Sequence, residues 1–141
     1  MTLSCKGLSQ EALNQAIRQS AESQLSLVNV LGQRYLASGL AGKTLTLEGT
    51  PGNALGAYLD GSTVVVHGNA QDATGDTMND GLIEIHGSSG DATGYAMRGG
   101  AIYVRDNAGY RAGIHMKAYQ DKVPALIIGG RAGCFLGEYQ A

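Results

Sequence analysis

The sequence predicts an all-β fold, a right-handed parallel β-helix with about 19 residues per coil and an N-terminal capping helix. Two observations carry this prediction. The first is a glycine motif, Gly-x-x-Gly-x-x-x-Gly, that occurs five times between residues 49 and 137. The second is a short aliphatic run before each copy of the motif. One repeat of this length cannot bury an apolar face alone, so neighbouring repeats are expected to stack into a continuous core.

The repeat keeps a regular spacing. The last glycines of the five copies are separated by steps of 19, 19, 19 and 24 residues, and the longer step contains an insertion at residues 120–124. Glycine suits such turns because it adopts positive φ readily and lets backbones approach at the ~4.8 Å spacing of stacked strands. We expect the turns to be formed by Gly49, Gly52, Gly56, Gly68, Gly75, Gly87, Gly90, Gly94, Gly109, Gly113, Gly130, Gly133 and Gly137.

The aliphatic runs alternate with period two, which is typical of β-strands. Their first and third positions are aliphatic in every repeat and are expected to face the core, whereas the middle positions are mixed and are expected to face outward. The runs are residues 45–47, 64–66, 83–85, 102–104 and 126–128. A further inward column follows the last glycine of each motif by three residues. Its members are Leu59, Met78, Met97, Met116 and Gln140.

The first 24 residues differ from the repeat and are expected to form a helical cap, so that residues 1–141 make one domain with coils over 25–141. Ser9 is placed to cap a helix, and Leu8 to pack on its first turn. Terminal elements of this kind cover the end of a solenoid. At the other end the last coil is expected to be covered by a partner or by further chain. The expected apolar face of the helix is Leu13, Ala16, Ile17 and Ala21.

Charge and cysteine content exclude several classes of protein. The chain has 10 Lys+Arg against 12 Asp+Glu, a net charge of −2, which provides no basic field for nucleic acid or for an anionic membrane. No apolar run approaches the ~20 residues of a membrane span. Cys5 and Cys134 fit neither a disulfide framework nor a zinc or iron–sulfur site. We therefore expect a cytoplasmic protein.

Two patterns resemble ligand sites without the context that such sites need. Residues 37–44 match a relaxed phosphate-loop pattern, but a β-run begins at Thr44, so no helix N-terminus follows to bind phosphate. His67 and His86 share a column, but a third ligand is missing and Arg105 would repel a metal ion. A solvated surface ladder is the favoured interpretation of the two histidines.

Asn53, Asp72 and Asp91 also share a column, in segments similar to calcium-binding nonapeptides. A calcium roll repeats every ~9 residues and would give ~18 per coil, whereas this repeat takes 19. Asx-type turns are therefore the favoured interpretation. The acidic residues are too scattered for catalysis by paired carboxylates.

A group of polar and aromatic residues near the end of the repeat suggests a docking face. Tyr and Arg are enriched at protein–protein contacts, although an ordinary solvated face is an equal alternative. The group consists of Tyr95, Arg98, Tyr110, Arg111, His115 and Lys117.

Three long segments carry a family resemblance: NVLGQRYLASGL (29–40), GDATGYAMRGG (90–100) and IIGGRAGCFLGEYQA (127–141). They resemble the Gly-x-Gly-x-Gly domain at the C-terminus of the glutamate synthase large subunit, in its free-standing form. The resemblance covers nearly the whole chain and implies a right-handed β-helix. The departures are Gln71 and Asp106 in place of motif glycines, and Pro51 in the first turn.

The resemblance implies an architectural role without catalytic residues. The expected partners are a glutaminase (amidotransferase) and a synthase that carries FMN and an iron–sulfur cluster, and together they would transfer the amide nitrogen of glutamine to 2-oxoglutarate. No cofactor or metal is expected on this chain. Two alternatives stay open: a subunit of a formylmethanofuran-dehydrogenase-type complex, which shares the repeat, and a free-standing β-helix that binds carbohydrate or calcium. A homo-oligomer is a further expectation.

Overall fold

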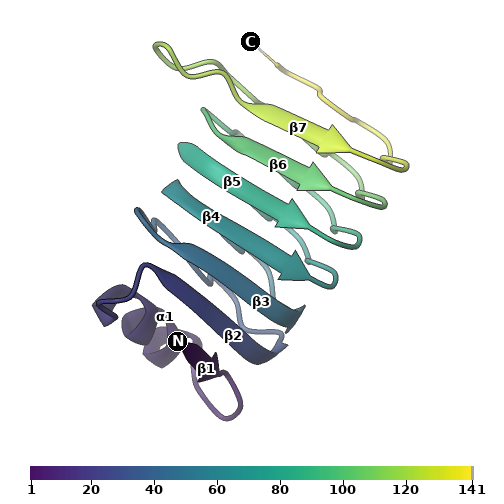
Figure 1. Ribbon diagram of the computed structural model, residues 1–141. Helices are drawn as coiled ribbons and strands as arrows, with labels where there is room; N and C mark the ends of the chain where they lie inside the picture. Colours follow the sequence, from purple (N-terminus) through teal and green to yellow (C-terminus); the bar gives the residue numbers. More distant parts are fainter. Residues whose placement is uncertain (141) are drawn as a thin grey trace.

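The chain forms a right-handed parallel β-helix in the computed structural model, which describes residues 1–140 (Figure 1). Residue 141, the last of the predicted coil region, lies outside the described residues. All seven strands pair in parallel and in chain order, and they form one sheet on one side of the solenoid. The strands are β1 (Thr2–Ser4), β2 (Gln24–Leu31), β3 (Thr44–Thr50), β4 (Asp60–His67), β5 (Asp80–Ile85), β6 (Ala101–Val104) and β7 (Ala125–Ile128).

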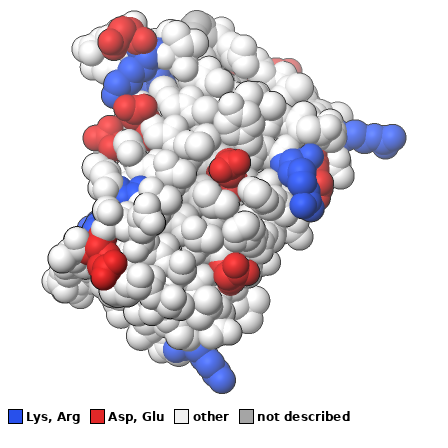
Figure 2. Space-filling view, in the orientation of Figure 1, with Lys and Arg blue, Asp and Glu red and all other residues white. Residues whose placement is uncertain are grey.

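The register of the sheet confirms the predicted columns. Val64 pairs with Leu45 on one side and with Ile83 on the other, and the same spacing continues through β6 to β7. The first and third columns are buried from β3 to β6, and they become half-buried at β7. The middle column faces outward and is half-buried or exposed. Figure 2 shows few charged side chains over the middle of this strand-bearing face and more of them at its margins.

The return path of each coil is a turn rather than a second strand. In the second coil, positive φ recurs at alternate residues, at Ala54 (62°), Gly56 (66°) and Tyr58 (58°). The N–H groups of Ala54 and Tyr58 donate to carbonyls of the next coil, and that of Gly56 donates to the Leu36 carbonyl of the preceding coil at 2.8 Å. Later coils repeat this pattern. The turn side is therefore hydrogen-bonded between coils as regularly as the sheet.

The helix α1 (Gln10–Gln19) lies at the β1 end of the solenoid (Figure 1). Ser9 caps it as predicted, because its side chain accepts a hydrogen bond from the Ala12 N–H at 3.2 Å. Leu13 and Ile17 are fully buried in the core cluster. The prediction for Ala21 was wrong: the helix ends two residues earlier, at Gln19, Ser20 is extended, and Ala21 is exposed. No helix in the described part of the chain is long and apolar enough to span a membrane.

Candidate docking surface

The predicted turn glycines fall into two structural classes. One class takes a left-handed φ, for example +72° at Gly94. The other has no left-handed φ but lies against the preceding coil, so that a Cβ at Gly87 would lie 2.5 Å from the Gly68 carbonyl oxygen. The first class is Gly49, Gly56, Gly68, Gly75, Gly94, Gly113 and Gly137. The second class is Gly52, Gly87, Gly90, Gly109, Gly130 and Gly133.

The column of Asn53, Asp72 and Asp91 joins coils instead of closing local turns. The Oδ1 atoms of Asn53 and Asp72 accept the backbone N–H of the next member of the column, at 3.1 and 2.7 Å. Asp91 Oδ1 accepts the N–H of Tyr110 at 2.8 Å. These bonds connect residues 19 apart, so the expectation of Asx-type turns was wrong. The turn geometry aims each side chain along the solenoid axis, where it binds the next coil.

A second ladder runs parallel to the first. Asn69 Oδ1 accepts the N–H of Ser88 at 2.8 Å, and Ser88 Oγ accepts the N–H of Asn107 at 3.2 Å. Asn107 Oδ1 then accepts the N–H of Arg131 at 2.8 Å. Both ladders satisfy backbone donors at the edge of the turns, which stabilises the stacking of coils.

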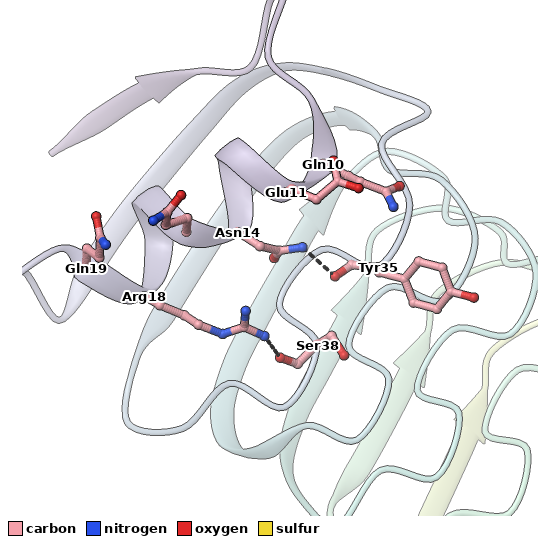
Figure 3. A pocket seen from close by; sticks show the side chains of 8 residues that line it. Gln10, Glu11, Asn14, Arg18, Gln19, Tyr35 and Ser38 are labelled. Carbon is pink, nitrogen blue, oxygen red and sulfur yellow. Dashed lines mark hydrogen bonds between the residues drawn. The ribbon is translucent and has the colours of Figure 1, made fainter.

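A hollow of about 500 Å³ lies between α1 and the first coil (Figure 3). Asn14 donates to the Tyr35 carbonyl at 2.9 Å, and Arg18 donates to the Ser38 carbonyl. Nearby, the Lys43 Nζ donates to the carbonyl of Ser20 at 2.7 Å, just beyond the helix. The lysine of the phosphate-loop pattern thus anchors the helix, and β3 follows it directly. These contacts attach α1 to the solenoid.

The two histidines lie at the carboxyl ends of the central strands β4 and β5. The ring centroids of His67 and His86 are 5.0 Å apart, and Glu84 lies 3.9 Å from His86 Nε2. Arg105 pairs instead with its neighbour Asp106, and this hydrogen bond raises the pKa of Arg105 and lowers the pKa of Asp106. Within residues 1–140, no three His, Cys, Asp or Glu side chains are grouped to hold a metal ion.

Four of the six predicted docking residues surround one hollow of about 250 Å³: Tyr95, Arg98, His115 and Lys117. We call these four residues the basic corner. They come from the ends of two consecutive turns, and each is exposed or half-buried. The rings of Tyr95 and His115 meet edge to face, with centroids 5.5 Å apart. The turn geometry therefore brings two cations and two rings to one edge of the solenoid.

The other two predicted residues, Tyr110 and Arg111, lie outside the lining of this hollow. They begin the same turn whose end supplies His115. Arg111 lies over the ring of Phe135, 5.4 Å from its centroid. The predicted group is thus divided between the two ends of a turn.

Sequence reasoning missed three aromatic residues on this surface. Tyr139 stacks on His115, with centroids 5.0 Å apart and planes at 12°, and the Tyr119 ring lies 5.7 Å from the Arg98 guanidinium. Phe135, under Arg111, is the third. Tyr139 and Phe135 each lie one repeat after their partners, so column counting could have found them. Tyr119 belongs to the loop that lengthens the last repeat, and no column predicts its position.

One known protein family matches almost the whole of this chain. The GXGXG motif family matches residues 9–141, from the cap of α1 through the last turn. The chain belongs to this family. It is the family of the C-terminal domain of the glutamate synthase alpha subunit, as the resemblance implied.

One curated relative of this chain is an uncharacterized protein of Methanocaldococcus jannaschii. It is 54% identical over 134 residues, which cover 93% of this chain and 51% of the relative. The chain thus spans about half the length of the relative it matches. No solved structure matches the chain significantly.

Proposed function

We propose that this GXGXG chain is a non-catalytic scaffold of a glutamate-synthase-type assembly. Partner components would release ammonia from glutamine and add it to 2-oxoglutarate, with electrons that reach an FMN and an iron–sulfur cluster on the synthase. This chain would hold those components against its solenoid. Its own residues would supply rigid surface and contacts.

The observation that carries this proposal is the family match over residues 9–141, which includes every coil of the solenoid. The polar chemistry of the turns supports it. The carboxamide and carboxylate oxygens of the two ladders bind backbone N–H groups of neighbouring coils, and Lys43 binds carbonyls next to the helix. The ladder groups hold one coil to the next, and Lys43 holds the helix to the solenoid. These polar side chains therefore stabilise the backbone of the solenoid.

The experiment is recovery of the chain, tagged at its native level, from its own cells under mild conditions. Companions would be identified and quantified by mass spectrometry against an untagged strain. We expect a glutaminase and a flavin and iron–sulfur synthase in fixed ratio to this chain. The purified assembly should form glutamate from glutamine and 2-oxoglutarate, whereas the chain alone should not.

Other outcomes would contradict the proposal in identifiable ways. Molybdenum or tungsten subunits in fixed ratio would assign the chain to a formylmethanofuran-dehydrogenase-type complex instead. A chain recovered alone, with a melting temperature that rises on addition of calcium or of oligosaccharides, would identify a binding β-helix.

A further inference from the structure

The basic corner stacks two cations in one column. Arg98 and Lys117 occupy equivalent positions in consecutive coils, because their N–H groups donate to the carbonyls of Met78 and Met97 at 2.9 and 3.0 Å. Equivalent residues of neighbouring coils lie about 5 Å apart at the backbone. Among residues 1–140, no carboxylate lies within 4.0 Å of either cation. Both side chains line the same hollow, so their like charges raise the free energy of the empty surface, and an anion between them would lower it.

Aromatic rings beside these two cations add apolar contact area to the positive charge of the basic corner. Tyr95, His115 and Tyr139 form a row of contacting rings, edge to face at the first pair and stacked at the second, with centroids 5.5 and 5.0 Å apart. Aromatic side chains offer large contact area with few rotatable bonds, so little conformational entropy is lost when a ligand packs on them. The Tyr119 ring also restrains the Arg98 guanidinium, 5.7 Å from its centroid. A guanidinium held in this way keeps N–H groups available to donate.

The size of the hollow and the net charge of the chain limit which kinds of ligand could bind at the basic corner. A volume of about 250 Å³ is below the ~300–1,000 Å³ of pockets that enclose small molecules. Nucleic acid is disfavoured because the chain carries a net charge of −2. An exposed group of Tyr and Arg side chains is typical of protein interfaces. Charge complementarity therefore selects an acidic protein segment.

We propose that the basic corner docks an acidic segment of a partner protein and seats a Glu or Asp carboxylate between Arg98 and Lys117. The planar guanidinium matches the two oxygens of a carboxylate, and the lysine adds a second positive charge from the next coil. The Tyr95, His115 and Tyr139 rings would pack against residues that flank the carboxylate. This inference rests on the proposed function, because it supplies the contact through which the scaffold would hold one of its components.

The test is a titration of the ¹⁵N-labelled chain with a capped hexaglutamate peptide at low salt, followed by NMR. We expect shifts centred on the amides of residues 95–98 and 115–117, and weaker binding as salt is added. The double variant Arg98→Gln/Lys117→Gln should weaken binding at least tenfold. The matched control Lys6→Gln/Arg34→Gln removes the same charge from exposed positions elsewhere and should stay within twofold of the original affinity.

Several results would overturn the inference. Shifts spread over the whole surface, or equal weakening in both double variants, would mean non-specific attraction. Binding of hexaglutamine with the same affinity would remove the role of the carboxylate. Free glutarate that binds at the same amides as tightly as the peptide would indicate a small-molecule site. Thermal unfolding of each variant, together with Arg98→Lys, which keeps the charge but loses the guanidinium geometry, separates a binding defect from a folding defect.

The same double variant separates this inference from the proposed function. If glutaminase and synthase are recovered equally with the original chain and with Arg98→Gln/Lys117→Gln, the docking inference fails and the scaffold function stands. If neither component is recovered with the original chain, the scaffold function fails. The peptide titration then still decides whether the corner recognises a carboxylate.

Discussion

Replacing Gly87 with alanine should destabilise the solenoid more than replacing Gly94, although only Gly94 has a left-handed φ. A Cβ at Gly87 would lie 2.5 Å from the Gly68 carbonyl oxygen and 2.5 Å from Asn69 Oδ1. Ordinary contact begins at 3.4 Å, so the two coils would have to separate by nearly 1 Å. That movement would break the 2.8 Å hydrogen bond from Ser88 N–H to Asn69 Oδ1 and strain the bonds beside it.

The expected magnitudes follow from these contacts. Two inter-coil hydrogen bonds at about 0.5–1.5 kcal/mol each, together with the strain of displaced backbone, give about 3 kcal/mol for Gly87→Ala. Gly94→Ala should cost only about 1–2 kcal/mol for its φ, because the nearest atom to its Cβ is the Met97 sulfur at 2.9 Å, and that side chain is flexible. Ala92 and Ala96, in the same turn as Gly94, already adopt positive φ.

The assay is urea and thermal unfolding of both variants, with Gly42→Ala as the control. Gly42 has φ +71° and no atom within 4 Å of its Cβ position, so this control measures the conformational cost alone. We expect the unfolding midpoints to fall in the order Gly42→Ala, Gly94→Ala, Gly87→Ala, from highest to lowest. A Gly87→Ala protein that unfolds with or after Gly94→Ala would refute the argument that close approach, rather than φ, limits this position.

Three further predictions concern other contacts. Asp91→Ala should lower the free energy of unfolding in urea by about 1–2 kcal/mol, because it removes the acceptor of the Tyr110 N–H. Asp91→Asn keeps an Oδ1 and should stay near the original stability. Equal losses of stability in the two variants would argue against the ladder. Lys43→Met should speed hydrogen exchange in α1 before the coils are affected, and unchanged helix protection would contradict its anchoring role. At neutral pH, Cys134 should react with a thiol reagent at once and Cys5 only after unfolding, because Cys5 is buried and burial raises the pKa of its thiol, which stays protonated. Rapid labelling of both thiols in the folded protein would disprove this.

The sequence was sufficient to predict the fold because the same residue pattern recurs in every repeat. Aliphatic residues recur at each inward strand position, and the structure pairs Leu45 with Val64 and Val64 with Ile83 as the spacing requires. On the turn side, the backbone preferences of single residues did not predict the conformation. Tyr58 and His115 adopt positive φ, which their side chains do not favour, because the inter-coil hydrogen bonds of their N–H groups fix the conformation.

The docking surface was only partly predictable for a related reason. Column counting places Tyr95 and His115 in neighbouring columns of consecutive coils, where their rings can meet diagonally. It does not say whether an Asp side chain bonds within its own turn or along the axis, because both arrangements satisfy the same spacing. Nor does it place Tyr119, whose contact with Arg98 depends on the path of a loop outside the repeat.

The hydrogen bonds between coils also bear on how the chain folds. They join neighbouring coils, so the loop that must close for each new contact is short, about 19 residues in the central coils and about 24 in the first and last coils. The entropy lost in closing a loop grows with its length, and it does not accumulate as coils are added. Each finished coil is a template for the next one. A solenoid of this kind can therefore grow by zippering outward from whichever coil forms first.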